Sequence, residues 1–390
     1  MNPRRVIDRH RDLVIALVLL GGAAILPFFF DTGSPFMDDA VTALAYVVMA
    51  LGLNIVVGFA GLLDLGYVAF FAIGAYTIGW LASGFAFDVN GGEGIHIGVS
   101  GFVENLPGIH LNFLLVVVAA VITTAIAGAL IGLPTLRLRG DYIAIVTLAF
   151  GEIIRVFALN GNEITFGGTY TLTGGAQGIT PVDKIDLPFT ETFTSLNLRP
   201  WFWTALGLVA VVLFVNFRLR DSRLGRAWIA LREDEIAAAS MGVPLVKTKL
   251  LAYATGAAFG GISGAFLGSY LNTVNSDQFQ FSFSIFVLAM VILGGMGNIW
   301  GVMLGAVVLS FVNNYLIPDV LNPLPGHVGL DFDLTELSFG IFGFLLVIMM
   351  VLRPEGLLPE RRRKLELGGI GAGDTTGVGT DPEAFYEVRA

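Results

Sequence analysis

The stretch LNFLLVVVAAVITTAIAGALIGL, residues 111–133, decides the fold class, because it carries no charged side chain from end to end. A helix of this length rises about 35 Å, and the hydrocarbon core of a bilayer is about 30 Å thick. Soluble folds hide their apolar runs in elements shorter than about 18 residues. The stretch therefore predicts a helix that crosses a membrane.

The rest of the chain repeats this pattern. Hydrophobic residues make up 55% of the 390 residues and charged residues 14%, and the mean hydropathy is +0.77, whereas soluble domains are roughly 25% charged. We predict an all-α, polytopic membrane helix bundle of about ten transmembrane helices within residues 13–352. The other nine apolar runs are 13–30, 41–59, 65–87, 142–159, 201–217, 250–271, 279–295, 299–317 and 337–352.

The distribution of basic residues predicts the orientation. Short cytoplasmic loops of membrane proteins are enriched in Lys and Arg, and ten spans place 19 of the 22 basic residues on one side, seven of them in the loop 218–249. Both termini are then cytoplasmic: residues 1–12 precede the first span, and residues 353–390 form a tail. Beyond about residue 366 the tail is rich in Gly, Thr and Asp, so we expect it to be disordered.

Motifs for catalysis are missing from the sequence. There are no cysteines, and the four histidines are scattered without metal-ligand spacing, so no metal site is expected. The sequence has no Gly-x-Ser-x-Gly, His-Glu-x-x-His or Walker-type phosphate-binding motif. We therefore expect a chain that is not an enzyme and whose energy source lies elsewhere.

Two ionisable residues lie inside the fifth predicted span. Glu152 and Arg155 are three positions apart, which places them on one helix face, where they can form an ion pair. Ionisable groups in spans often mark a pathway, so we consider a gate or path role and, equally, a structural ion pair. Neutralising either residue alone is expected to be more harmful than neutralising both.

A second polar group surrounds the glycine-containing junction 58–66. Asn54, Asp64, Tyr67 and Tyr76 lie on or near it. Interrupted helices often line substrate sites in transporters, which makes Asn54 and Tyr67 candidates for the translocation path or gate. The alternative for Asp64 is a tight cytoplasmic turn between two spans.

Glycines recur at every fourth position of the seventh predicted span. Gly256, Gly260, Gly264 and Gly268 share one helix face, which lets a neighbouring helix approach closely. Gly297, Gly301 and Gly305 repeat the spacing. We assign the first four to helix packing.

The cytoplasmic stretch 221–244 predicts two short amphipathic helices. The second is rich in Ala, begins with acidic residues and ends at Gly242 and Pro244. A basic loop that only binds anionic lipid headgroups would not need this order, although its arginines would be attracted to them equally well.

These motifs together resemble a known family, the LivM-type permeases of ATP-binding-cassette importers for branched-chain amino acids. The likeness runs in order from about residue 40 to 360. The matching stretches are LGLNIVVG (51–58), GLLDLGY (61–67), LRLRGDY (136–142), AIVTL (144–148), FGEIIR (150–155), LTGG (172–175), GRAW (225–228), ALREDEIA (230–237), LGGMG (293–297) and RPEGLLP (353–359).

The resemblance implies partners and a location in the cell inner membrane. It implies a LivH-type sister permease, two cytoplasmic ATPases of LivG and LivF type, and an external amino-acid-binding protein, with no nucleic acid involved. ATP and Mg would be bound by the ATPases, so no cofactor is expected in this chain. The segment with Glu235, Ala238, Ala239 and Gly242 corresponds to the family's ATPase-coupling helix, although Ile236 stands where the strict pattern has the acidic residue.

Two other functions remain as alternatives. The nearest is an ABC permease for urea, other amides or other amino acids, against which the run REDEIAA (232–238) favours the branched-chain amino-acid permeases. The second is an ion-coupled secondary transporter or channel, for which more acidic residues inside the spans would be expected.

Overall fold

A computed structural model describes residues 3–99, 103, 105–135, 138, 141–166, 170–186, 193–322, 337–353 and 356–358. The α-helices are α1 (Pro3–Ile25), α2 (Pro35–Leu53), α3 (Val68–Leu81), α4 (Phe113–Thr135), α5 (Asp141–Asn160), α6 (Arg199–Arg220), α7 (Arg223–Glu233), α8 (Glu235–Ser240), α9 (Leu245–Tyr270), α10 (Phe281–Gly294), α11 (Ile299–Phe311) and α13 (Ser338–Leu352). Two π-helical segments, η2 (Asn54–Phe59) and η8 (Val312–Leu321), continue α2 and α11.

The helices match the predicted spans. Among the described residues, six helices are long and apolar enough to cross a membrane: Pro35–Phe59, Phe113–Thr135, Tyr142–Asn160, Arg199–Arg220, Leu245–Tyr270 and Ile299–Pro318. Four shorter apolar helices are Val14–Phe28, Val68–Leu81, Phe281–Gly294 and Gly340–Met349. Each of the ten predicted runs overlaps one of these helices, so the all-α polytopic membrane fold is confirmed.

Helix α4 shows why such a sequence needs a bilayer. Val116, Ala120 and Thr124 recur at every fourth position and are buried against neighbouring helices. Between them, Val118 and Ile122 are exposed although they are as apolar as the buried face. An exposed face of this kind is stable next to lipid tails, not next to water.

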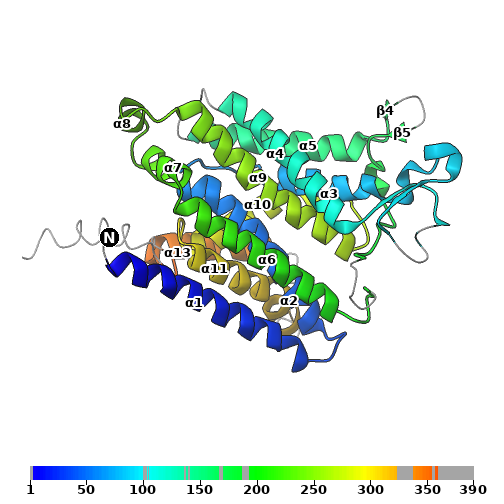
Figure 1. Ribbon diagram of the computed structural model, residues 1–390, viewed down its shortest axis with the longest axis horizontal. Helices are drawn as coiled ribbons and strands as arrows, with labels where there is room; N and C mark the ends of the chain where they lie inside the picture. The colour runs from blue at the N-terminus through cyan, green and yellow to red at the C-terminus, as the bar shows by residue number, and fades with distance from the viewer. Residues whose placement is uncertain are drawn as a thin grey trace, which may run out of the picture.

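The helices run side by side, with the short helices α7 and α8 and the loop strands at opposite ends. Figure 1 shows α7 and α8 at the end where α1 begins, and β4 (Thr165–Phe166) and β5 (Tyr170–Thr171) at the other end. Two segments predicted on the same side of the membrane, the amino terminus and the loop 218–249, therefore lie at one end of the bundle. The tail segment 359–390, including the part expected to be disordered, lies outside the described residues.

The first helix begins at Pro3, and its apolar part, Val14–Phe28, lies within the predicted run 13–30. One predicted boundary was wrong. The third helix ends at Leu81, where a run to 87 was predicted, because the chain becomes extended at Ser83 and enters a small sheet. That sheet has the order β1 (Ala82–Ser83), β3 (Ile109–Leu111), β2 (Ile95–Ile97), with β1 antiparallel and β2 parallel to β3. Short 3₁₀ turns complete the loops: η1 (Leu26–Phe28), η3 (Gly84–Ala86), η4 (Val89–Gly92), η6 (Gly175–Gln177) and η7 (Ser276–Phe279).

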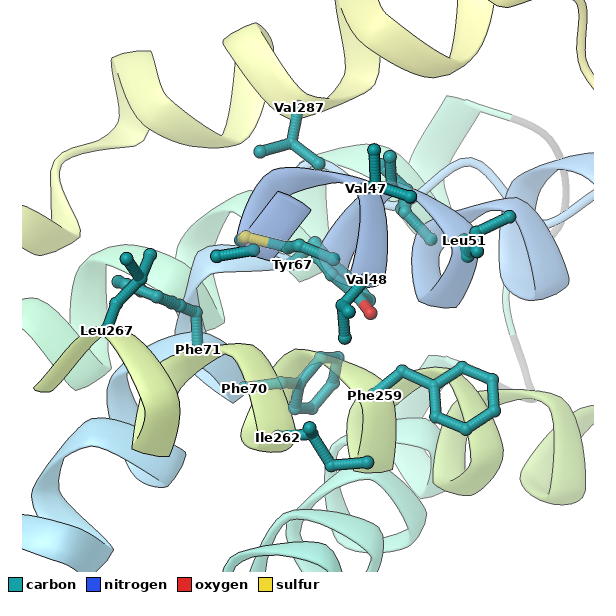
Figure 2. Packing of buried hydrophobic residues seen from close by; sticks show 14 of the residues in the cluster. Val47, Val48, Leu51, Tyr67, Phe70, Phe71, Phe259, Ile262, Leu267 and Val287 are labelled. Carbon is teal, nitrogen blue, oxygen red and sulfur yellow. The ribbon is translucent and has the colours of Figure 1, made fainter. Parts of the chain in front are cut away.

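The core lies where α9 packs against α2 and α3. Figure 2 shows side chains of α2, α3, α9 and α10 meeting in one apolar cluster, with Phe70, Phe259 and Ile262 close together. The glycine face of α9 makes this packing close. A Cβ atom at Gly264 would overlap the backbone of Phe71 and lie 2.8 Å from the backbone nitrogen of Ala75.

The other three glycines of this face also abut neighbouring elements. A Cβ at Gly256 would lie 3.0 Å from the carbonyl oxygen of Gly52, one at Gly260 would lie 3.2 Å from the Cβ of Phe70, and one at Gly268 would lie 2.8 Å from a methyl group of Ile78. The second series behaves differently. Gly301 and Gly305 pack against α10, but Gly297 lies in the turn after α10 with φ +87°.

Candidate functional site

The loop 218–249 folds into two helices that share a capping residue. Ser222 caps α7 by accepting hydrogen bonds from the backbone N–H groups of Leu224 and Gly225. Asp234 ends α7 and caps α8, because its Oδ1 accepts from the N–H groups of Ile236 and Ala237 at 2.8 and 3.0 Å. A carboxylate at this position also interacts favourably with the helix dipole. The two predicted amphipathic helices therefore exist as a single capped unit.

Helix α8 has one face toward the bundle and one face toward solvent. Ala238 is buried, and Glu235 forms an ion pair with Lys249 of α9 at 2.7 Å. On the outer face, Ile236 is 68% exposed and Met241 85% exposed, and Ala239 and Gly242 are exposed as well. Of the four residues predicted for ATPase coupling, Ala239 and Gly242 thus lie on the accessible face, while Glu235 and Ala238 hold α8 to its own chain.

Gly242 ends α8 by a conformation that glycine adopts easily. Its φ is +85°, and the N–H of Val243 returns to the carbonyl of Ala238 at 3.0 Å, as in a helix C-terminal motif closed by glycine. No atom lies within 4 Å of a Cβ placed on Gly242. The end of α8 is therefore an open, small surface.

Helix α7 is anchored to α9 by a buried tryptophan. Trp228 is fully buried and its Nε1 donates to the carbonyl oxygen of Thr248 at 2.9 Å. Together with the ion pair of Lys249, this bond joins the α7–α8 unit to the first turns of α9. The sequence motif GRAW (225–228) is explained by this contact and by Gly225, whose Cα lies against the carbonyl end of α6.

The junction after α2 is an interrupted helix, as the glycines predict. The π-helical segment η2 ends at Phe59, and α3 begins only at Val68. We call residues 60–67 the break segment. The side chain of Asn54 accepts a hydrogen bond from the N–H of Gly297 at 2.9 Å, and the hydroxyl of Tyr67 donates to the carbonyl of Gly256 at 2.6 Å.

Both of these candidate path residues are fully buried. In this conformation Asn54 therefore fixes the start of η2 to the turn after α10, and Tyr67 fixes the end of the break segment to α9. Asp64 is buried too, and its Oδ1 accepts from the N–H of Gly66 at 2.8 Å. Asp64 thus lies in the connection between two apolar helices, where the sequence offered a tight turn as the alternative, and its carboxylate is buried there.

The predicted pair on α5 forms as an ion pair. Arg155 Nε lies 3.0 Å from Glu152 Oε2, and the two side chains are 31% and 38% exposed. The pair thus lies at the surface of this chain, where a second subunit or a path between subunits could contact it. The geometry fits either of the two roles that the sequence left open.

Sequence reasoning missed a hydrogen-bonded cluster in the loops at the strand end of the bundle. His110 is fully buried, its Nδ1 lies 2.6 Å from Asp183 Oδ2, and the ring of His96 stacks on it with centroids 5.2 Å apart. Burial raises the pKa of the Asp183 carboxyl, and the hydrogen bond from His110 opposes part of that rise. His96 and His110 look scattered in the sequence because they are far apart along the chain, and only the pairing of β2 with β3 brings them together. Among the described residues, no group of three or more His, Cys, Asp or Glu side chains could hold a metal ion.

Comparison with known proteins agrees with this architecture. Residues 37–350 match the model of the family described as branched-chain amino acid transport system, permease component. The chain is 38% identical over 377 residues to the LivM permease protein of Salmonella typhimurium, which covers 92% of this chain and 77% of that protein. The identity to the LivM of Escherichia coli is also 38%, over 379 residues and the same shares.

More distant relatives extend the comparison. A probable LivM of Methanocaldococcus jannaschii is 28% identical over 331 residues, covering 81% of this chain and 91% of that protein. The LivH permease protein of E. coli is 26% identical over 170 residues, or 44% of this chain and 49% of that protein. No solved structure shows significant similarity to the chain. The chain belongs to the family of permease components of branched-chain amino-acid transport systems, and within it is of LivM type.

Proposed function

We propose that the chain is the transmembrane permease subunit of an ATP-binding-cassette importer that translocates leucine, isoleucine and valine. The observation that carries the proposal is the 38% identity to two LivM proteins across 92% of the chain. The capped α7–α8 unit supports it independently, because a transporter without an ATPase has no need of a rigid helix pair on its cytoplasmic face.

The proposed complex contains three kinds of partner. The partial similarity to LivH supports a sister permease of that type, which would complete the translocation pore. Two cytoplasmic ATPases, of LivG and LivF type, would bind ATP and Mg, since this sequence has no phosphate-binding loop. An external amino-acid-binding protein would deliver the substrate. We place the complex in the cell inner membrane.

The exposed face of α8 is the part that would contact an ATPase. It presents Ile236, Met241 and Ala239, a small and largely apolar surface that could enter a groove. Closure of the ATPase pair on ATP would then push the α7–α8 unit as a rigid body. The ion pair between Glu235 and Lys249 would pass this force to α9, whose glycine face packs against α2 and α3.

The translocation path would run beside the break segment. Freed backbone groups of interrupted helices commonly serve as substrate contacts in transporters. Asn54 and Tyr67 would hold the segment closed in the present conformation, and the pair of Glu152 and Arg155 would lie at the edge of the path or at the sister permease.

Uptake measurements test the proposal. Cells that lack the chain and cells that express it are supplied with labelled leucine or labelled urea. We expect leucine uptake to depend on the chain and urea uptake to be indifferent to it. Chain-dependent urea uptake without leucine uptake would favour an amide permease. Leucine uptake that persists without any copurifying ATPase, and that stops when ion gradients are dissipated, would favour a secondary transporter.

A further inference from the structure

One contact joins the α7–α8 unit directly to the interrupted helix. The Nη1 atom of Arg232, in the last turn of α7, donates to the carbonyl oxygen of Gly58 at 2.6 Å. Gly58 belongs to η2, immediately before the break segment. Because the donor carries a charge, this hydrogen bond is among the stronger kinds in proteins.

A glycine in the break segment, Gly61, lets the chain pass close to the side chain of Arg232. Gly61 has φ +68°, and a Cβ built on it would lie 2.5 Å from Cγ and 3.1 Å from Cβ of Arg232. A residue with a side chain would therefore be strained at position 61 and would push the arginine away. The stem of Arg232 thus lies across the start of the break segment while its guanidinium holds the end of η2.

The break segment is otherwise held by the body of the bundle. Leu65 N–H donates to Thr147 of α5 at 3.0 Å, and Val68 N–H donates to Ser284 of α10 at 3.0 Å. These bonds fix its far end. The part that contacts α7 runs from Gly58, near the end of η2, to Gly61, near the start of the break segment.

Arg232 is also close to α8 along the chain. Only Glu233 separates it from Asp234, the residue that ends α7 and caps α8. A displacement of α8 therefore moves Arg232, which is only two residues from the cap of α8. The hydrogen bond from the guanidinium to Gly58 then passes this movement to the end of η2, where the break segment begins. The contacts of Trp228 and Glu235 lead to α9 instead.

We propose that Arg232 is a positioning residue that transmits the movement of α8 to residues 58–61, where η2 ends and the break segment begins, and so opens the path. This inference rests on the proposed function, because it assigns a route for the force that an ATPase would supply. It predicts that loss of the guanidinium uncouples ATP hydrolysis from uptake, whereas a purely structural arginine would affect both through the amount of assembled complex.

The experiment uses the complete transporter in proteoliposomes, where leucine uptake and ATP hydrolysis are measured on the same sample. Arg232→Gln is expected to keep ATP hydrolysis and to lower the uptake per ATP about tenfold, since it removes a charge-assisted hydrogen bond. Arg232→Lys keeps a charged donor and should recover most of the ratio. The matched control is Arg226→Gln on the same helix, because Arg226 is exposed and bonds to the carbonyl of Asp221; its ratio should equal that of the wild type.

If Arg232→Gln takes up as much leucine per ATP hydrolysed as the wild type, the inference is overturned. If Arg232→Gln does not assemble, Gly61→Ala tests the contact from the other side, because it retains the guanidinium and displaces its stem; an unchanged ratio in that variant would overturn the inference equally. Failure of the proposed function looks different, since the wild-type complex itself would then show no ATP-dependent leucine uptake.

Discussion

The close packing of α9 on α3 gives a prediction with a definite magnitude. In Gly264→Ala the new methyl group would overlap the carbonyl of Phe71 and lie 2.8 Å from the nitrogen of Ala75. Both atoms belong to the backbone of α3, so no side-chain rotation can make room. The two helices must move apart by several tenths of an ångström or more, and overpacking of this kind costs about 1–3 kcal/mol.

The intrinsic helix preference of alanine works in the opposite direction. Replacing glycine by alanine in a helix stabilises it by about 1 kcal/mol. Gly207→Ala in α6 is therefore the matched control, because nothing lies within 4 Å of a Cβ at that position. The preference cancels between the two variants, and Gly264→Ala should be less stable than Gly207→Ala by about 1–3 kcal/mol.

Thermal unfolding of the detergent-purified chain measures this difference. One kcal/mol shifts the midpoint of a 390-residue chain by about 1 °C, because the entropy of unfolding is about 2.1 cal/mol/K per residue, so we expect the two midpoints to differ by at least about 1 °C, with Gly264→Ala lower. Helix association in membranes depends largely on such packing. Equal midpoints for the two variants would show that α9 and α3 are not in close contact, and would refute the packing described for the glycine face.

Three further changes have definite expected results. Glu235→Gln leaves the buried ammonium of Lys249 without its carboxylate and should destabilise the chain by about 1–3 kcal/mol, which is less than for a wholly buried pair because Glu235 is partly exposed. Adding Lys249→Met should recover part of this loss in a double-mutant cycle of unfolding midpoints. Losses that simply add would contradict the pairing. The pKa of Asp183 is raised in the folded chain, so its carboxyl binds a proton more readily there than in the unfolded chain, and its contribution to stability is present below the ordinary pKa of Asp and is lost as the pH rises through the raised value. Across that pH window the midpoint of thermal unfolding should fall more for the wild type than for Asp183→Asn, whose amide oxygen still accepts from His110. Parallel plots of midpoint against pH for the two proteins would refute this. Gly242→Arg adds a long side chain to the open end of α8 and should leave the chain inserted while ATP hydrolysis continues without uptake, so normal uptake by this variant would contradict the role of α8.

The apolar helices and their packing faces were predictable from the sequence, because both are local properties. Uncharged runs longer than about 18 residues have few options besides a membrane span. The fourfold spacing of Gly256 and Gly264 places them on one face whatever the neighbours are. The capped pair α7 and α8 was predictable for the same reason, since Asp234, Gly242 and Pro244 are start and stop signals within a few residues of each other.

The contacts that define the site depend on residues far apart in the chain. The break segment is held by Thr147, 82 positions after Leu65, and Asn54 bonds to Gly297, 243 positions later. Nothing near residue 64 indicates whether its carboxylate faces water or the bundle. The side chain of Glu235 likewise points toward α9 because it pairs with Lys249 on that helix. The accessible face of α8 could therefore not be predicted from the sequence of α8 alone.

The resemblance to LivM permeases supplied the substrate class and the partners, which no local pattern could give. The comparisons show the family, and the structure adds the contacts of the α7–α8 unit: α8 bonds to α9 through Glu235, and α7 bonds to the interrupted helix through Arg232. These contacts change how the coupling segment is understood, because two of its four predicted contact residues hold α8 in place instead of facing outward.

The most direct measurement is leucine accumulation by the reconstituted transporter. The chain is purified with its sister permease and two ATPases, inserted into vesicles, and supplied with labelled leucine and the external binding protein, with ATP or with a non-hydrolysable analogue on the ATPase side. We expect accumulation only with ATP and the binding protein, and only when this chain is present. Accumulation that is the same with the analogue, or in vesicles that lack the chain, would contradict its assignment as an ATP-driven permease subunit.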